Sequence, residues 1–418
     1  MSDRLPNKEE QDIQFEEWKS SQAFEEVDTE EVKESLISEL EFLSKMSVEE
    51  YTLWRKWREI QEKYPVKKIT VNPFFVDDKE VIYHPYLLTL KDNIWIPESP
   101  EDYKKLQPTL ILANGDKRLT SIWQTLRIFI HTQHNNRNIG RNLLFVSVDK
   151  ITGKYLGIIA CSSDFMDLTP RDKYIGWTRE QRTDDRMINH TTIGSTIVPT
   201  QPLGYNFLGG KLLALLIISN VVEDVWNSRY SDKLVGITTT SLYGSFSQYQ
   251  RLRYWTKRGH SAGSIRFEPS SEKVNLAKKW LKYYHPQRYW EWYKATSKDD
   301  RMPLKRDYKQ RSLAFIYRQL DIDKSLIETN HQRGIYFCPL FKNTNEFLRQ
   351  EINEDKLERK FDNNIESLVD IWKENYAKKR INQLIKDGRY NTEVLFYHGI
   401  IGKSWEETRE KYLREVGR

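Results

Sequence analysis

The chain has 418 residues and a net charge of +6, with 38% hydrophobic and 30% charged residues. This composition predicts a folded protein of two or three units and excludes a disordered chain. The longest apolar run, Leu212 to Ile218, is far shorter than the roughly 20 residues that a membrane span needs, so we expect no membrane contact.

The N-terminus and the cysteines both favour a cytoplasmic location. The opening residues MSDRLPNKEEQD are polar and acidic, unlike a signal peptide. Cys161 and Cys338 are the only cysteines and lie far apart in the sequence. They predict neither a disulfide framework nor a zinc site, and they fit a reducing compartment.

Charge is distributed unevenly along the chain. Residues 1–50 carry a net charge of −11, whereas residues 251–320 carry a net charge of +12 together with 13 aromatic residues. Basic side chains neutralise phosphates and aromatic rings stack on bases, so we expect this segment to contact double-stranded DNA. A solvated helical face over an aromatic core is the alternative. The cations that we assign to DNA are Arg251, Arg253, Lys257, Arg258, Lys278, Lys279, Lys282 and Arg288.

The first predicted element is an acidic helical arm over residues 1–65. Apolar residues recur at helical spacing between Thr29 and Met46, and Thr29 followed by two glutamates suits a helix start. We expect the arm either to cover a basic surface of the same chain or to contact a protein partner. A solvated helical hairpin is the alternative.

Residues 66–270 are expected to form an α/β core, beginning with short strand-like runs up to residue 90. Helical spacing follows from Arg118 to His134. His131 and His134 lie three residues apart within it, a spacing that suits a metal ligand pair. Because no third ligand is apparent nearby, we expect no metal site.

Strands and helices then alternate, which is typical of a mixed central sheet with flanking helices, an α+β fold. Residues 271–418 are expected to be basic and mostly helical, with a turn-rich insertion from His331 to Arg349. The predicted core elements are a hairpin over 142–163, a helix over 178–191, a strand over 192–200, a helix over 210–230, a strand over 233–244, a helix over 245–259 and a strand from 260.

A glycine-rich loop precedes Lys211 and raises the question of phosphate binding. A nucleotide P-loop needs glycine where Tyr205 stands and a hydroxyl residue where Leu212 stands, so nucleotide hydrolysis is not expected. The dinucleotide pattern fails as well. A helix N-terminus after a strand still suits an anion such as a pyrophosphate. The alternative is that Gly209 and Gly210 only let the helix pack closely on the sheet.

This layout resembles the GNAT family of N-acyltransferases. In that fold a hairpin precedes a strand, and a Gln/Arg-x-x-Gly-x-Gly/Ala loop holds the pyrophosphate of coenzyme A. Gln201 to Asn206 matches the first two marks and ends in asparagine, and Arg253 to His260 is similar to a later aromatic helix that ends in glycine. The resemblance implies acetyl-coenzyme A or a related acyl donor. The donor-binding residues that it implies are Gln201, Gly204, Asn206, Gly209, Gly210 and Lys211.

The stretch from Leu156 to Gly263 also resembles the DruA-type family, which belongs to a bacterial anti-phage system. Trp255, Gly259 and Gly263 are similar to the end of that family's pattern. A third resemblance is to phage Mom-type proteins, which are GNAT-like and add a carbamoylmethyl group to the adenine amine in DNA. The other marks shared with the DruA type are Ser162, Ser163, Arg171, Asp172, Ile175, Gly176, Trp177, Arg182, Asn189 and Pro199.

These resemblances imply a GNAT-like, DNA-base-modifying transferase in a phage or phage-defence context. The alternative is a non-catalytic DNA-binding protein of the DruA type, acting in defence or counter-defence. A nuclease is not expected, because no acidic-x-Lys pattern lies on neighbouring strands. Each candidate catalytic residue has a structural alternative as a capping or core hydrogen-bonding group. The candidates are Asp185, Asn189, His190, Ser195 and, from the GNAT resemblance, Tyr254.

Overall fold

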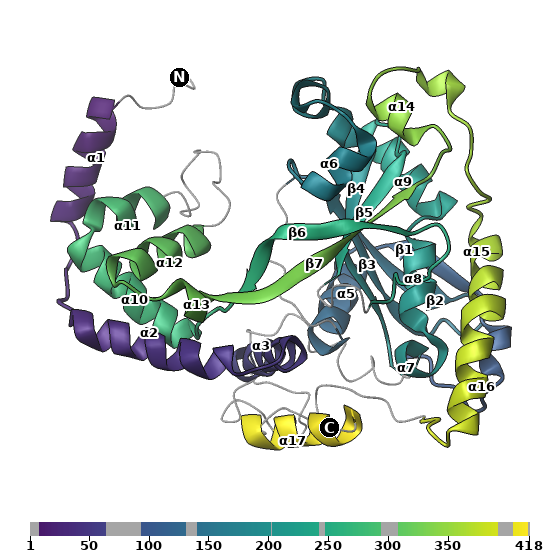
Figure 1. The fold of residues 1–418 in the computed structure, drawn as a ribbon, viewed down its shortest axis with the longest axis horizontal. Coiled ribbons are helices and arrows are strands. Elements are labelled where there is room, and N and C mark those ends of the chain that lie inside the picture. Colours follow the sequence, from purple (N-terminus) through teal and green to yellow (C-terminus); the bar gives the residue numbers. More distant parts are fainter. Residues whose placement is uncertain are drawn as a thin grey trace. The chain divides into compact units, whose positions relative to one another are not determined.

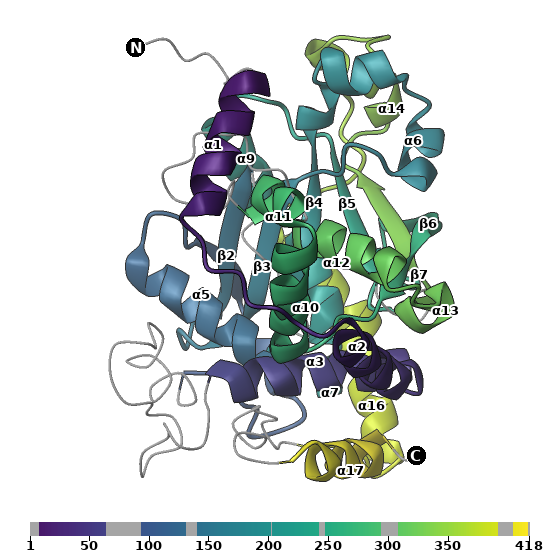
Figure 2. The same ribbon diagram turned by 90° about the vertical axis from the view of Figure 1, so that its left-hand side faces the viewer.

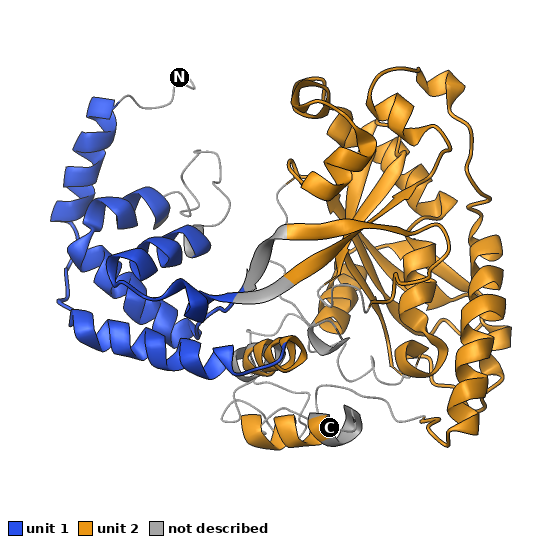
Figure 3. Cartoon of the chain, in the orientation of Figure 1, with its two compact units in different colours: residues 1–47, 264–331 blue, residues 48–263, 332–418 orange. Residues whose placement is uncertain are grey.

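The structure, a computed structural model, describes residues 8–63, 93–130, 140–201, 203–241, 247–293, 308–391 and 404–416. The chain divides into two compact units, shown in separate colours in Figure 3. Unit 1 comprises residues 1–47 and 264–331, and unit 2 comprises residues 48–263 and 332–418. The expected strand-like runs before residue 90 and the pair His131 and His134 lie outside the described residues.

A seven-stranded mixed sheet, in the order β1-β2-β3-β4-β5-β7-β6, organises the described part of unit 2 (Figure 1). Strands β1 to β4 pair antiparallel with their neighbours, β4 and β5 are parallel, and β5 is antiparallel to β7. The result is an α+β fold, as expected. The strands are β1 (Pro108–Leu112), β2 (Asn142–Asp149), β3 (Tyr155–Ser163), β4 (Thr191–Pro199), β5 (Gly236–Ser241), β6 (Thr256–Arg266) and β7 (Glu328–Pro339).

The predicted hairpin is confirmed as β2 and β3, and its two faces are covered by different helices. Leu143 and Phe145 belong to the main core, which also holds α8 (Gly209–Leu216). Helix α5 (Lys117–Ile130) packs against β2 and β3, and its buried residues lie outside that core. Because side chains alternate along a strand, α5 therefore covers the opposite face of the hairpin.

The helix expected from Gly210 to Tyr230 is divided in two. Helix α8 ends at Leu216 and α9 (Asn220–Tyr230) begins after a short turn. The backbone N–H of Asn220 donates to the carbonyl of Asn363 at 2.8 Å, so the turn is held by a distant segment of the chain. An apolar run that is buried on all sides gives no sequence signal for such a break.

Three other expected elements differ from the structure. The helix over 178–191 is replaced by a π-helical turn, η3 (Glu180–Asp184), and a 3-10 turn, η4 (Met187–His190), separated by Arg186 at φ 61°. The helix over 245–259 is wrong in its described part, because turns precede β6. The turn-rich insertion from His331 to Arg349 is also wrong at its start, which forms β7 in the sheet.

The remaining elements of unit 2 flank this sheet. Helix α15 packs on α8, and the π-helical turn η7 joins it to α16 (Figure 1). Helices α3 and α17 contact each other. The bounds are α3 (Val48–Lys63), η2 (Asp102–Lys105), α6 (Thr169–Ile175), α7 (Leu203–Phe207), α14 (Thr344–Leu348), η6 (Glu354–Lys356), α15 (Ile365–Trp372), η7 (Lys373–Ala377), α16 (Lys378–Lys386) and α17 (Trp405–Val416).

Unit 1 is helical and joins the acidic arm to the basic segment. Helix α2 buries Val32, Leu36, Leu40 and Leu43 and packs on α10 and α13, while α1 contacts α11 (Figures 1 and 2). This division differs from the expected boundaries at residues 65 and 270, because the apolar stripe of α2 is buried against residues far along the chain. The helices are α1 (Lys8–Ser20), α2 (Thr29–Ser44), α10 (Ser271–Tyr284), α11 (Pro286–Tyr293), α12 (Tyr308–Gln319) and α13 (Lys324–Ile327).

Among the residues that the structure describes, no helix combines the length and apolarity that crossing a membrane would require.

Candidate functional site

The glycine-rich loop between β4 and α8 is closely packed. Leu208 has φ 53° and places Gly209 and Gly210, both buried, at the start of α8. A Cβ atom at Gly209 would lie 2.7 Å from the Leu203 side chain, and one at Gly210 would overlap the side chain of Gln248. Gly209 therefore lets the helix pack closely against Leu203 and Pro199, and a side chain at Gly210 would have to displace Gln248.

The polar residues of this loop bond to other parts of unit 2. Lys211 Nζ donates to the carbonyls of Gln248 and Gln250 at 2.9 and 2.6 Å, and burial lowers the pKa of Lys211 to about 8. The Asn206 amide donates to the Asn391 carbonyl. Gln201 Oε1 accepts from the backbone N–H of Tyr205 at 2.9 Å. The polar side chains of the predicted donor loop, Gln201, Asn206 and Lys211, thus all form hydrogen bonds within the chain.

Gln248 also fills the space where β4 and β5 separate. The two strands pair only from Thr191 to Gly194 on β4. Beyond that point Gln248 Nε2 donates to the carbonyl of Ile197 at 3.0 Å and to the hydroxyl of Tyr249 at 3.0 Å. The Tyr249 hydroxyl in turn accepts from Thr239 on β5 at 3.2 Å. Gln248 and Tyr249, which follow β5, therefore link β4 to β5 by side-chain hydrogen bonds where the two strands no longer pair.

The candidate catalytic residues occupy separate places. Ser195 lies beside Ser162, with 3.0 Å between their hydroxyl oxygens, at a bulge between β3 and β4. His190 Nδ1 lies 2.9 Å from the carbonyl of Lys233. Asp185 is exposed after η3, and the Tyr254 ring stacks on Phe361 at 3.9 Å between centroids.

Asn189 and His190 do lie at one polar cluster, which the sequence did not indicate. Arg141 Nη1 donates to the carbonyl of Asn189 at 3.0 Å, and the Arg141 guanidinium pairs with Asp232. Asp232 Oδ1 lies 3.9 Å from His190 Nε2. The guanidinium also lies 4.8 Å from the Tyr230 ring centroid. This cluster ties the start of β2 to the end of α9.

A buried ion-pair network follows β3. Arg171 Nη1 lies 2.7 Å from Asp164 Oδ1, and both side chains are fully buried. Arg171 also pairs with Asp172 at 2.7 Å, and Asp172 accepts from the Trp177 indole at 3.1 Å. Thr238 on β5 donates to Asp164 at 2.7 Å. The network therefore fixes α6, which carries Arg171 and Asp172, against the sheet.

A basic surface forms where α7, the turn after β5 and α16 converge. We define it by Lys211, Arg251, Arg253, Arg380 and Arg389, together with Tyr205 and Tyr376. The Tyr376 hydroxyl donates to the carbonyl of Arg251 at 3.2 Å and accepts from the backbone N–H of Arg253 at 2.8 Å, and Lys211 Nζ lies 5.2 Å from its ring.

Tyr205 joins α16 to this basic surface. The Arg380 guanidinium lies 5.1 Å from the Tyr205 ring, and Arg389 donates to the Tyr205 hydroxyl at 3.3 Å. Arg251, Arg253 and Arg389 are exposed, as is 37% of Tyr205. Sequence reasoning found Arg251 and Arg253 but missed Arg380 and Arg389, although the basic run of α16 was a signal for them.

The other predicted DNA-binding cations fall in different surroundings. Lys257 lies beside His260, with 2.8 Å between the two nitrogens, and the half-buried Arg258 lies 3.3 Å from the Tyr174 ring centroid. Burial lowers the pKa of Arg258. Lys278, Lys279, Lys282 and Arg288 lie in unit 1, on α10 and α11.

Comparison with known proteins identifies the family. The family model described as Druantia protein DruA matches residues 102–350, more than half of the chain. The chain belongs to the DruA family. It is 32% identical over 155 residues to the Druantia protein DruA of Escherichia coli strain UMEA 4076-1, across 33% of this chain and 38% of that protein. The match thus spans well under half of the relative's length, and no solved structure matches the chain.

The family match contains the ion-pair network and the glycine-rich loop but ends before α16. The DruA-type marks Arg171, Asp172, Trp177 and Arg182 all belong to the network. Gly176, another mark, ends α6 with φ 79°, a conformation that favours glycine. The DruA resemblance in this stretch therefore rests largely on residues that build the fold. Arg380 and Arg389 of the basic surface lie outside the matched residues.

Proposed function

We propose that the chain is a non-catalytic, double-stranded DNA-binding protein that acts in phage defence. The observation that carries the proposal is the basic surface of unit 2. Exposed arginines from two separate parts of the chain, Arg251 with Arg253 and Arg389, converge there, and exposed cations of this kind contact backbone phosphates. Two tyrosines lie among them: the side chains of Arg380 and Arg389 contact Tyr205, and Tyr376 bonds to the backbone of Arg251 and Arg253. The defence context rests on membership of the DruA family.

The division of charge between the units supports the same surface. Residues 1–47 have a net charge of −9 and residues 264–331 one of +6, so unit 1 has a net charge of −3. The whole chain has a net charge of +6, so unit 2 has a net charge of +9. The net positive charge of unit 2 favours association with a polyanion such as DNA. In unit 1 the negative charge of the acidic arm outweighs the positive charge of residues 264–331.

The binding test compares two double variants of equal charge. Arg251→Gln with Arg253→Gln removes two exposed cations of the basic surface, and we expect about a tenfold loss of affinity for a short duplex. Lys342→Gln with Lys356→Gln is the matched control in unit 2, because both lysines are exposed and pair with acidic neighbours. Fluorescence anisotropy measures both. Equal losses in the two variants would count against the assigned surface.

A GNAT-like, Mom-type transferase is the second candidate. The order of hairpin, strand, loop and helix in β2, β3, β4 and α8 supports it, as does the limited pairing of β4 with β5. An acyl-type or carbamoylmethyl donor such as acetyl-coenzyme A at this loop would require Gln248 and Lys211 to exchange their present partners. The contacts within the loop lead us to place this candidate after DNA binding.

Nucleoside mass spectrometry separates the two candidates. DNA co-expressed with the chain should contain no new nucleoside if the protein only binds DNA. A modified adenine or another new base would support the transferase and overturn the non-catalytic proposal. Gly209→Leu is a poor variant for this purpose, since a side chain there would collide with Leu203 and Pro199 and disturb the packing of α8.

A further inference from the structure

The acidic arm covers a basic and aromatic face within unit 1. Lys279 and Lys282 lie on α10, and Tyr289 and Trp290 lie on α11. All four contact residues of α1 or of the segment that joins α1 to α2. The sequence alone had indicated this face as a DNA contact and had also indicated that the arm could cover a basic surface.

The cations of this face bind acidic and polar groups of the joining segment. Lys279 Nζ lies 2.9 Å from Glu25 Oε2. Lys282 Nζ donates to the side chain of Gln22 at 3.0 Å and to the carbonyl of Ala23 at 3.2 Å, and it lies 5.5 Å from the Phe24 ring centroid. The arm therefore places oxygen atoms against ammonium groups, as a phosphate backbone does.

The aromatic residues of this face bind rings of the arm. Trp18 stacks on Tyr289, with centroids 6.0 Å apart and planes 22° apart. Phe15 meets Trp290 edge to face at 5.6 Å. Rings that accept an indole in this way also accept unpaired bases, because every base has a π-face. Charge and stacking partners are thus arranged together, as single-stranded DNA would present them.

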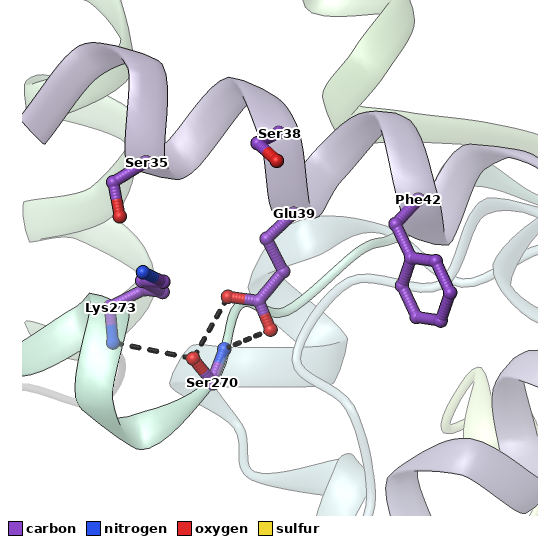
Figure 4. A pocket seen from close by; sticks show the side chains of 6 residues that line it. All are labelled: Ser35, Ser38, Glu39, Phe42, Ser270 and Lys273. Atoms are coloured by element: carbon purple, nitrogen blue, oxygen red, sulfur yellow. Dashed lines mark hydrogen bonds between the residues drawn. The ribbon is translucent and has the colours of Figure 1, made fainter. Parts of the chain in front are cut away.

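Helix α1 is held more weakly than α2. None of the 13 residues of α1 is buried, whereas four of α2 are. The pair of Lys279 with Glu25 is exposed, at 57% and 72% of the two side chains, and exposed ion pairs contribute little to stability. Glu39 of α2, by contrast, accepts from the Ser270 backbone and hydroxyl at 3.0 and 2.8 Å (Figure 4). Ser270 is the N-cap residue of α10 and lies with Glu39 beside a pocket of about 420 Å³, so this contact anchors α2 in unit 1.

We propose that the face formed by Lys279, Lys282, Tyr289 and Trp290 is a binding site for single-stranded DNA, and that residues 8–25 occupy it as an internal competitor. The site is separate from the basic surface of unit 2 and goes beyond the proposed duplex binding. A single strand displaces α1, while α2 stays in place on its buried residues. The arm thereby raises the concentration of single-stranded DNA needed for binding.

The test removes most of the competing segment and keeps the rest of unit 1 folded. Deletion of residues 2–20 in the full-length chain, combined with Glu25→Gln, should raise affinity for a single-stranded oligonucleotide about tenfold, measured by anisotropy. Trp18→Ala in the intact chain should raise it several-fold. Glu41→Gln is the control. Glu41 is exposed on α2, so this substitution removes one negative charge and leaves the contacts of the arm with α10 and α11 unchanged. Thermal unfolding confirms that each variant is folded.

Two further measurements make the outcome decisive. In the deletion variant, Lys279→Gln with Lys282→Gln should reverse the gain in affinity. The same gain should appear in a background that carries Arg251→Gln and Arg253→Gln, so a failure of the duplex surface would not hide it. Folded deletion and Trp18→Ala variants that bind single strands no more tightly than the intact chain would overturn the proposal, as would a gain that survives loss of both lysines.

Discussion

The buried Asp164 shows how a single side chain can carry much of the local stability. Its carboxylate is fully buried, and it meets the guanidinium of Arg171 and the hydroxyl of Thr238. Taking charges out of water is costly, and loss of one partner leaves the other charge uncompensated. We therefore expect substitution of a buried carboxylate in the network to reduce the free energy of unfolding much more than substitution of an exposed one.

Asp164→Asn should lower the free energy of unfolding by about 3 kcal/mol, since it leaves Arg171 with one carboxylate fewer in a buried site. Chemical denaturation measures the change. Asp167→Asn is the matched control, because Asp167 pairs with Arg182 from a side chain that is 84% exposed. That variant should cost less than about 1 kcal/mol. Similar losses in the two variants would show that burial does not govern the network.

Only part of this ion-pair network can be recognised from the sequence. Arg171 and Asp172 are adjacent in the sequence in front of a tryptophan, and the structure shows that they form an ion pair in which Arg171 is fully buried. Asp164 and Thr238 could not be assigned to it, because they are seven residues before Arg171 and on a different strand. The helix predicted over 178–191 would bring the catalytic candidates Asp185 and Asn189, four residues apart, to one face, but that helix does not form, since Arg186 adopts φ 61° between them. Their roles stay predictions.

At the scale of elements, local patterns identified β2, β3, β4 and β5 but missed β7. Hairpin partners are adjacent in sequence, whereas β7 pairs Pro339 with Gly236 about a hundred residues earlier. No local pattern reports such a pairing. The expected helix after β5 failed for a different reason, because Arg251 and Tyr254 both have positive φ values, 53° and 73°, and stop helical geometry.

Glu223 links elements across a similar distance. This buried residue of α9 binds Arg359 through both carboxylate oxygens, at 2.8 and 2.9 Å, and also Lys233 and Asn363. Burial alone would raise the pKa of Glu223, but Arg359 and Lys233 hold it below the ordinary value of 4.5. A depressed carboxyl pKa contributes stability above the unfolded pKa and loses it as the pH falls through the folded pKa.

Glu223→Gln should therefore reduce the free energy of unfolding by about 3 kcal/mol at neutral pH, and the difference from the wild type should vanish below the folded pKa. Urea denaturation at a series of pH values from neutral to acid measures it. Glu351→Gln serves as the control, since Glu351 is an exposed partner of Arg349. A difference for Glu223→Gln that stays constant into acid would contradict the ion-pair explanation.

At the scale of the whole molecule, the two units divide the charge in a way that the linear sequence conceals. The sequence indicated residues 251–320 as the basic region, but residues 264–331 form a unit with the acidic arm. An amphipathic stripe in residues 29–44 predicts burial without naming its partner. Only the fold brings Arg380 and Arg389 beside Tyr205, and so forms the basic surface on which the proposed function rests.

The most direct test of that function is the salt dependence of duplex binding by the full-length chain, compared with a variant in which Arg251, Arg253, Arg380 and Arg389 are all glutamine. Each phosphate contact contributes about 0.9 to the slope of log affinity against log salt. If each of the four arginines contacts one phosphate, the variant should bind more weakly and lose about 3.6 from the slope of the wild type. An unchanged slope and affinity, with the variant folded, would contradict binding through the basic surface.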